Sequence, residues 1–457
     1  MYKTRSQYSR GLLGSMPGLR LPIEKTKEWT AALKLELFYS KKDILEMYLN
    51  TVSFGSNAYG IFTASKTYFN TTPDKLSYEQ SAVLVGLLKA ITKYNPYLNP
   101  ENSINRRNVV LSQLAGNKYI TPQVADSLKE IPLRLNYNIE KPNEGIAPYF
   151  RANLTRFLEK WGENNGYDIY ADGLKIYVTI DSRMQKYAEE AVRKQMRQLQ
   201  RNFFEHWSGQ NPWRGENGNE LKKFIPEIAK RTKVYGKRAS KNANNSDSIN
   251  KYMNIPRKMK VFEYDKGEKT VTMSPMDSIR YMNHFLHCGF LAMEPDTKYV
   301  KAWVGDVNYD YWQYDKVAQS KRQPGSTFKL FVYTAALIAG KSPCDKVEDK
   351  PFVWGTGKYA WRPKNANGGY SYADLSLKRA FAKSVNTVAA QLAKEVGIAN
   401  VAKCAHLLGI KSKLEEVPTL SLGASDVTLL EMVNSYSTIA GEGMYHSPII
   451  VTKIVDK

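Results

Sequence analysis

The feature that most constrains this chain is a change of pattern along its 457 residues. Residues 25–130 carry repeated helix-start signals: the capping-box-like Ser40–Asp43, and a polar residue placed before proline at Asn99–Pro100 and at Thr121–Pro122. After residue 288, short β-type runs alternate with apolar helical runs. A chain of this length with two such patterns is expected to form several domains, an all-α one followed by an α/β one.

Between these two parts, residues 131–287 are expected to form a linker region. It holds one β-type run, 175–180, and then a long amphipathic helix over about 182–200. The stretch 206–256 shows little periodicity and many polar residues, so we expect a loosely ordered loop. We therefore assign an insertion over 196–280 and predict three regions: 1–130, 131–287 and 288–457.

The last region combines a β-hairpin with several helices. Two β-type runs, Gly289–Met293 and Tyr299–Trp303, flank a turn at Pro295–Thr297. A further strand is expected to begin near 448–452. Helices are expected near 326–340, 375–381, 386–396, 398–408 and 426–440.

The charge balance points to anionic partners. Lys and Arg number 66 and Asp and Glu 44, for a formal net charge of +22. Such an excess attracts nucleic acid, lipid headgroups or phosphorylated substrates. No nucleic-acid-binding motif accompanies the densest basic patch, Lys222–Lys241, so we favour a membrane surface or an anionic glycan over nucleic acid. The sequence contains no apolar run of about 18 residues and no signal peptide. Its three cysteines predict no metal site.

The sharpest chemical signal is Ser326 followed by Lys329. On a helix, residues three apart share one face, so the amine can reach the hydroxyl. A serine becomes nucleophilic when a base takes its proton, and a buried lysine can be that base because desolvation favours the neutral amine. A lone S-x-x-K match is more often a helix cap with a solvated lysine, and the chain has a second copy at Ser248–Lys251.

A second pair of polar residues strengthens the first. Ser384 and Asn386 lie 58 and 60 residues after Ser326, on a short link between two apolar helices. Ser384 could relay a proton and Asn386 could bind a substrate amide; the plainer alternative is that either one caps the next helix. The combination of S-x-x-K with a later Ser-x-Asn is a known pattern of penicillin-interacting serine enzymes.

Taken together, these segments resemble the class A (bifunctional) penicillin-binding proteins along nearly the whole chain. The C-terminal segments that carry the resemblance are 321–329, 361–365, 384–389 and 420–428. The N-terminal ones are 25–28, 39–50, 68–70, 76–77, 94–96 and 106–111. The resemblance implies a multidomain α+β chain: an all-α lysozyme-like glycosyltransferase part, a linker, and an α/β serine transpeptidase domain of the β-lactamase-like fold.

The same resemblance implies roles for particular residues. In the transpeptidase part, Ser326 would be the nucleophile and Lys329 the general base. Glu28 would be a catalytic carboxylate of the glycosyltransferase. The remaining expected site residues are Ser384 and Asn386 (catalytic), and Lys25, Tyr48, Asn50, Arg106, Arg107, Gly325 and Trp361 (substrate-binding).

A family member polymerises lipid II into glycan and cross-links the stem peptides. The implied partners are lipid II, nascent peptidoglycan, β-lactam antibiotics, the membrane surface and other cell-wall synthesis proteins, without nucleic acid. The implied location is the outer face of the bacterial cytoplasmic membrane. No cofactor is implied with certainty, although the diphosphate site of the glycosyltransferase could take a divalent metal.

The chain also departs from the family pattern. It lacks the upstream motif with the first catalytic glutamate, the anchor helix and any Lys-Thr-Gly or Lys-Ser-Gly triplet. We therefore expect a chain truncated at both ends, with reduced or absent activity. The alternatives are another serine acyl enzyme, such as a D,D-carboxypeptidase or β-lactamase, a non-catalytic envelope scaffold, or a basic nucleic-acid binder.

Overall fold

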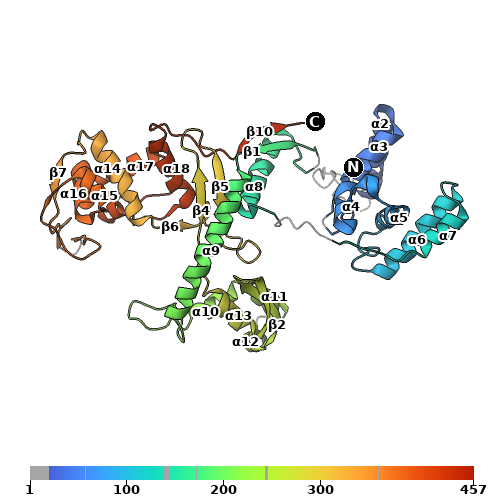
Figure 1. The fold of residues 1–457 in the computed structure, drawn as a ribbon, viewed down its shortest axis with the longest axis horizontal. Coiled ribbons are helices and arrows are strands. Elements are labelled where there is room, and N and C mark those ends of the chain that lie inside the picture. Colours follow the sequence, from blue (N-terminus) through green and yellow to red (C-terminus); the bar gives the residue numbers. More distant parts are fainter. Residues whose placement is uncertain are drawn as a thin grey trace. The chain divides into compact units, whose positions relative to one another are not determined.

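The computed structural model describes residues 20–56, 58–137, 145–170, 172–241, 245–357 and 360–456. The chain divides into two compact units, Met1–Glu144 and Gly145–Lys457 (Figure 1). The division at residues 130 and 287 made from the sequence remains a prediction.

The described part of the N-terminal unit is helical, as predicted. Its elements are α2 (Arg20–Phe38), α3 (Lys41–Thr51), α4 (Ile61–Phe69), η3 (Pro73–Lys75), α5 (Tyr78–Leu87), α6 (Pro100–Gly116) and α7 (Pro122–Lys129). The expected capping box is present at the start of α3, where Ser40 and Asp43 satisfy each other's backbone N–H groups. The core forms around Phe54, Tyr68 and Leu84, and the Tyr68 hydroxyl donates to the Phe54 carbonyl at 2.9 Å.

The C-terminal unit mixes helices with short strand pairs. Its helices are α8 (Pro148–Asn165), α9 (Ser182–His206), α10 (Phe224–Lys230), α11 (Lys233–Lys241), α12 (Ser246–Asn254), α13 (Pro275–Met282), η4 (Gly325–Phe328), α14 (Lys329–Ile338), α15 (Leu377–Ala382), α16 (Asn386–Val396), α17 (Ile398–Leu407), η6 (Pro418–Leu422) and α18 (Leu429–Ala440). Its strands are β1 (Lys175–Val178), β2 (Arg257–Glu263), β3 (Gly267–Met273), β4 (Phe290–Met293), β5 (Val300–Val304), β6 (Lys321–Arg322), β7 (Lys346–Glu348), β8 (Asp374–Ser376), β9 (Val427–Thr428) and β10 (Val451–Val455).

All the strand pairs are antiparallel, and they join β1 to β10, β2 to β3, β4 to β5, β6 to β9 and β7 to β8. The predicted hairpin is confirmed as β4 and β5, in register Phe290↔Val304. α9 packs against β5 and α18 packs against β4 (Figure 1). The hairpin thus lies between a helix that precedes it in the chain and one that follows it.

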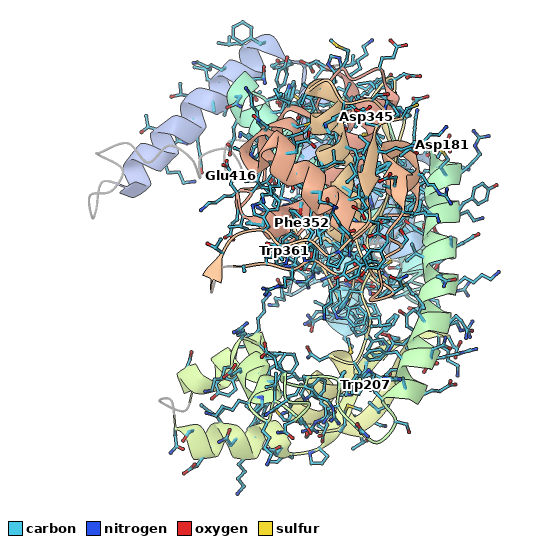
Figure 2. The ribbon with its side chains drawn as sticks, turned by 90° about the vertical axis from the view of Figure 1, so that its left-hand side faces the viewer. Asp181, Trp207, Asp345, Phe352, Trp361 and Glu416 are labelled. Atoms are coloured by element: carbon cyan, nitrogen blue, oxygen red, sulfur yellow. The ribbon has the colours of Figure 1, made fainter. Side chains whose placement is uncertain are left out.

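The long helix α9 extends beyond the predicted 182–200. Asp181 caps its first turn and Trp207 ends it, and Figure 2 shows these two residues at its opposite ends. Two buried glutamines on α9 anchor it by pairs of backbone contacts. Gln185 bonds to both the N–H and the C=O of Trp303, and Gln200 bonds to the C=O of His284 and the N–H of Leu286.

One prediction about the linker region is wrong. Most of 206–256, expected to be loosely ordered, is folded; Asn242–Asn244 lie outside the described residues. The segments are too short to show a clear period, but they share a core in which Ala229, Ile249 and Met253 are buried. Tertiary burial outweighs weak local preference here.

The largest core of the unit surrounds α14, α16 and α17. Phe328, Phe331, Val388 and Leu392 are each at most 1% exposed. Cys404 on α17 is buried in the same core, and burial raises the pKa of its thiol to about 11. Within the described ranges, no helix is both long and apolar enough to cross a bilayer.

Candidate active site

Ser326 lies where the chain enters α14. Residues Gly325–Phe328 form the single 3-10 turn η4, and Lys329 begins α14. In a 3-10 turn, residues i and i+3 eclipse each other, so Ser326 and Lys329 occupy one face. The Ser326 side chain is exposed, whereas Lys329 is only 1% exposed.

The core explains why Lys329 is buried. The first turn of α14 contributes Phe331 and Val332 to the core, and Phe328 precedes it there, each fully buried. Lys329 begins the same helix and is itself almost completely buried, so its amine is desolvated. Burial lowers the pKa of Lys329 to about 8, from an ordinary value of 10.5.

The Lys329 amine contacts the predicted second motif. Its Nζ donates to the Ser384 carbonyl at 2.6 Å, to Ser384 Oγ at 3.0 Å and to Asn386 Oδ1 at 2.5 Å. An ammonium has three N–H donors and no lone pair, so these contacts use all of them. Once neutral, the amine has a lone pair that can accept a proton. The Ser384 contact can then reverse, with the hydroxyl donating to the nitrogen.

Ser384 has an unusual backbone. It lies in the turn between α15 and α16, is exposed, and has φ = +52°. This left-handed conformation costs a non-glycine residue about 1–2 kcal/mol. The turn places both its carbonyl and its hydroxyl on Lys329, so the strain accompanies a contact of the candidate base.

Asn386 has its amide fully engaged. Oδ1 accepts from Lys329, and Nδ2 donates to the Lys364 carbonyl at 2.7 Å. Its backbone N–H donates to Asn365 Oδ1 at 3.0 Å. In this structure the side chain therefore orients Lys329, and the predicted contact with a substrate amide remains a prediction.

A buried carboxylate behind this turn was missed by sequence reasoning. Asp349, which is 4% exposed, accepts hydrogen bonds from Thr387, Asn365 and Ser371. Burial alone would raise the pKa of Asp349, but these hydrogen bonds outweigh it and hold the pKa below its usual range. No local pattern marks Asp349, because its nearest partner in the chain lies 16 residues away.

The nucleophile segment, residues 321–329, is held from outside α14 as well. The Gly325 N–H donates to the Gly423 carbonyl at 3.3 Å, and β6 pairs with β9. A Cβ atom at Gly423, whose φ is +78°, would lie only 2.7 Å from the Gly325 nitrogen. Tyr436 of α18 donates to the Thr327 carbonyl at 2.8 Å. Gly325 itself has φ = +58°.

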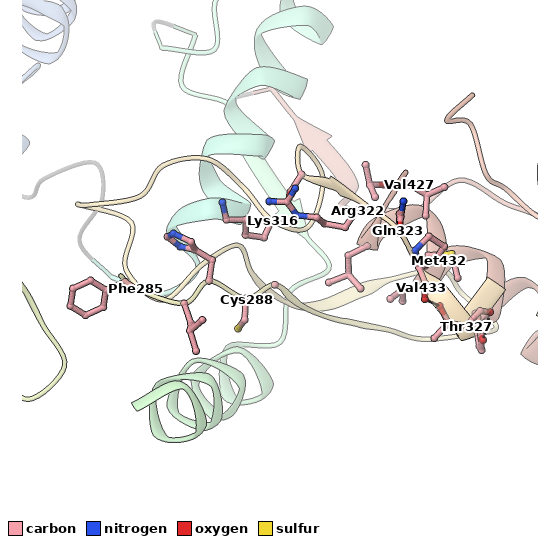
Figure 3. A pocket seen from close by; sticks show the side chains of 17 residues that line it. Phe285, Cys288, Lys316, Arg322, Gln323, Thr327, Val427, Met432 and Val433 are labelled. Atoms are coloured by element: carbon pink, nitrogen blue, oxygen red, sulfur yellow. Dashed lines mark hydrogen bonds between the residues drawn. The ribbon is translucent and has the colours of Figure 1, made fainter. Parts of the chain in front are cut away.

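A cavity of about 760 Å³ adjoins this segment (Figure 3). Gln323, Pro324 and Thr327 are among its lining residues, together with apolar residues such as Val427 and Met432. Neither Ser326 nor Lys329 is among the residues that line it, so the cavity does not include the candidate nucleophile or the candidate base.

Trp361, predicted to bind substrate, is half-buried in a bridge with Trp354. The backbone N–H of Trp361 donates to the Trp354 carbonyl at 2.8 Å, and the backbone N–H of Trp354 donates to the Trp361 carbonyl at 2.9 Å. The ring centroids are 6.5 Å apart. Phe352 packs on Trp354, and Figure 2 shows Phe352 near Trp361. The four residues after Trp361 lead to Asn365, which contacts the turn that holds Lys329.

In the N-terminal unit, Lys25 and Glu28 are paired. Lys25 Nζ lies 2.8 Å from Glu28 Oε2 on α2, with the lysine more exposed than the glutamate. The catalytic role of Glu28 and the substrate-binding role of Lys25 that the family resemblance implies remain predictions. Tyr48 and Asn50 are exposed on α3.

The two predicted arginines of α6 are placed differently. Arg106 is half-buried, with its guanidinium 5.8 Å from the centroid of the Tyr94 ring. Arg107 is 1% exposed and donates to the carbonyls of Lys129 and Ile131 at 2.7 and 2.6 Å. Burial lowers the pKa of Arg107. In the structure Arg107 thus holds the carbonyls at the end of α7, and its predicted substrate contact remains a prediction.

Two further observations concern possible metal ligands and the second S-x-x-K copy. Among the residues that the structure describes, no three His, Cys, Asp or Glu side chains form a group that could hold a metal ion, so we derive no step through a metal. The second S-x-x-K copy, Ser248 and Lys251, lies on α12 with both residues exposed. This second copy has the same spacing as Ser326 and Lys329, but its lysine is exposed to solvent whereas Lys329 is buried.

Family models match three stretches of the chain. One described as Transglycosylase matches residues 5–115, and one described as Penicillin-binding protein middle domain matches 208–286. One described as Penicillin binding protein transpeptidase domain matches 288–457. The folded region within 206–256 thus falls inside the stretch that the middle-domain model matches, and the insertion assigned to 196–280 remains a prediction.

Known proteins resemble the chain along most of its length. Penicillin-binding protein 1A of Aquifex aeolicus is 30% identical over 95% of this chain and 59% of that protein. Penicillin-binding protein 1A of Neisseria flavescens is 29% identical over 94% of this chain and 57% of that protein. The crystal structure of penicillin-binding protein 1A from Haemophilus influenzae shares the fold, with a TM-score of 0.61 and 24% identity over 91% of this chain and 64% of that one. The chain thus spans less than two thirds of these relatives.

Proposed function

Because the chain belongs to the class A penicillin-binding proteins, we propose that it is a peptidoglycan synthase. Its C-terminal unit cross-links stem peptides through an acyl-enzyme on Ser326, and its N-terminal unit extends glycan from lipid II. One observation carries the proposal: a lysine three residues from an exposed serine is buried and held by the Ser384 turn and Asn386.

The acylation step follows from this arrangement. Ser326 Oγ attacks the carbonyl carbon between the two terminal D-alanines of a stem peptide, and neutral Lys329 Nζ takes the hydroxyl proton. When the tetrahedral intermediate collapses, the C–N bond breaks. Ser384 Oγ passes its proton to the leaving amine, and Lys329 returns a proton to Ser384.

The acyl-enzyme is then resolved by an amine. The amine of a second stem peptide attacks the acyl carbon and its proton passes to Lys329. The C–O bond to Ser326 then breaks, and Lys329 returns that proton to Ser326 Oγ, which restores the free hydroxyl and the neutral amine. A β-lactam enters the same first step, since Ser326 opens its ring amide and remains acylated. Water in place of the amine would give hydrolysis, the outcome that distinguishes a D,D-carboxypeptidase from a transpeptidase.

In the N-terminal unit, we assign Glu28 to the reacting sugar hydroxyl and Lys25 to the donor diphosphate. The geometry that supports this is their 2.8 Å pair on α2. A lysine cation neutralises phosphate charge, and a nearby carboxylate can accept a hydroxyl proton as the new bond forms. Tyr48, Asn50 and Arg106 stay proposed substrate contacts of the same unit.

A membrane surface is the proposed location of both reactions. On α2, Trp29, Leu33 and Leu37 recur every four residues and are 73%, 64% and 70% exposed. This spacing places them on one helix face. An apolar helix face combined with a net charge of +22 suits anionic lipid, where the tail of lipid II resides.

The test is the intact mass of the purified chain after incubation with benzylpenicillin. We expect one added penicilloyl mass, lost in Ser326→Ala. Ser248→Ala is the matched control, since it removes the serine of the exposed S-x-x-K copy and should label normally. A folded chain that gains no mass, or that gains it in Ser326→Ala, would contradict the proposed acylation.

A further inference from the structure

The two carboxylate oxygens of Asp349 accept hydrogen bonds from different residues. Oδ1 accepts from Thr387 Oγ1 at 2.6 Å and from Asn365 Nδ2 at 2.8 Å. Oδ2 accepts from the backbone N–H and the hydroxyl of Ser371, both at 2.8 Å. Thr387 is fully buried and Asp349 nearly so, which shields the contact between them from water, whereas Ser371 is exposed.

Hydrogen bonds connect Asp349 Oδ1 with the candidate base, Lys329, through Asn365 and Asn386. Asn365 Oδ1 accepts the backbone N–H of Asn386 at 3.0 Å and that of Thr387 at 3.3 Å. These are the first two residues of α16, and Asn386 Oδ1 contacts Lys329 Nζ. The carboxylate is therefore joined to the amine by two asparagine side chains, each of which bonds a backbone group and a side chain.

We propose that Asp349 is a positioning residue for acylation, holding the first turn of α16 so that the oxygens of Ser384 and Asn386 stay on Lys329. The inference rests on the proposed function of Ser326. It assigns to a residue outside the Ser-x-x-Lys and Ser-x-Asn patterns the task of keeping the base in place.

The group has to be a carboxylate because all its partners donate. A carboxylate only accepts, with room for four hydrogen bonds, and it receives four here. An asparagine would turn an N–H toward a donor. The strained backbone of Ser384 explains why the start of α16 has to be fixed. Ser384 has a left-handed φ of +52°, and this conformation would relax if α16 could shift.

The two oxygens supply matched variants. Asp349→Asn disturbs the whole group. Thr387→Val removes one donor on the Oδ1 side while keeping shape, and Thr387→Ser keeps the hydroxyl. Ser371→Ala removes one donor on the Oδ2 side, away from Lys329, and so reports on stability alone.

Two readouts are measured on the full chain. The first is the rate of acylation by benzylpenicillin between pH 6 and 9, with Ser326→Ala as the blank. The second is amide hydrogen exchange of residues 383–388, which needs no acylation. Thermal unfolding midpoints of every variant show how much stability each change costs.

We expect Asp349→Asn and Thr387→Val to acylate at least about tenfold more slowly, since small misplacements of a reacting group cost up to about a hundredfold. Their rates should reach half-maximum at higher pH, because a loosened turn admits water to Lys329. Exchange over 383–388 should rise. Thr387→Ser and Ser371→Ala should stay within about twofold of the unsubstituted chain in rate.

Other results overturn the inference. Unchanged exchange and rates in folded Asp349→Asn or Thr387→Val would refute it. Equal rate losses in Ser371→Ala and Thr387→Val would reduce Asp349 to a purely structural residue. If the unsubstituted chain is not acylated, the proposed function falls, and hydrogen exchange then decides by itself whether Asp349 holds this turn.

Discussion

The pH dependence of acylation tests the candidate base directly. Burial lowers the pKa of Lys329 to about 8 from 10.5, and the base works only when neutral. At pH 7 the neutral fraction is then about one in ten, against about one in three thousand for an ordinary lysine. The fold therefore increases the reactive form about 300-fold.

The same shift affects stability, with a sign that can be checked. The folded chain binds this proton less tightly than the unfolded chain, so burial of Lys329 costs stability below pH 8. The cost is about 3 kcal/mol, and it disappears as the pH rises from about 8 to about 10.5. The free energy of unfolding of the C-terminal unit should thus gain a contribution in this window, absent in Lys329→Met.

The assay is the single-turnover rate of benzylpenicillin acylation from pH 6 to 10, followed by intact mass and corrected for spontaneous hydrolysis of the antibiotic. We expect the rate to rise about tenfold per pH unit up to about pH 8 and then to level off. Lys329→Arg should abolish acylation, because a guanidinium stays protonated. A rate that keeps rising to pH 10, or one that is flat from pH 6 to 8, would refute the role of buried Lys329.

Three further outcomes follow from the site and its supports. Gly423→Ala should slow acylation about a hundredfold, because its Cβ would press on the backbone of Gly325; Gly236→Ala, with open space around it, is the control, and an equal effect would contradict the reasoning. Ser384→Gly should be about 1 kcal/mol more stable than Ser384→Ala in thermal unfolding while both acylate slowly, since only glycine relieves the left-handed backbone. Arg107→Met should lower the free energy of unfolding of the N-terminal unit by about 1–3 kcal/mol by leaving two carbonyls unpaired, whereas an unchanged denaturant midpoint would argue that water replaces them.

Features set by neighbours in the sequence were predictable. The Ser40–Asp43 box begins α3, and α16 spans the predicted 386–396. Helix caps and proline positions act within four residues, so a local reading captures them. The hairpin β4 and β5 followed in the same way from two β-type runs around a short turn.

Features set by distant contacts were not predictable. α8 and the helices within 206–256 are stabilised by burial against segments far along the chain, which no local period records. Asp349 bonds to Thr387, which lies 38 positions further along the chain, and the hydrogen bond between Gly325 and Gly423 joins residues about 100 positions apart. The backbone contacts of Arg107 with Lys129 and Ile131 were likewise not predictable, because they lie 22 and 24 positions further along the chain.

The two S-x-x-K copies separate what sequence and tertiary structure each determined. By itself the sequence determined the spacing, because residues three positions apart lie on one face of a helical turn in both copies. Only the tertiary structure decided which lysine can act as a base. Lys251 lies exposed on α12 and is solvated, whereas Lys329 is enclosed by a core and contacted by Ser384 and Asn386. Desolvation, which depends on residues far away in the chain, favours the neutral amine of Lys329.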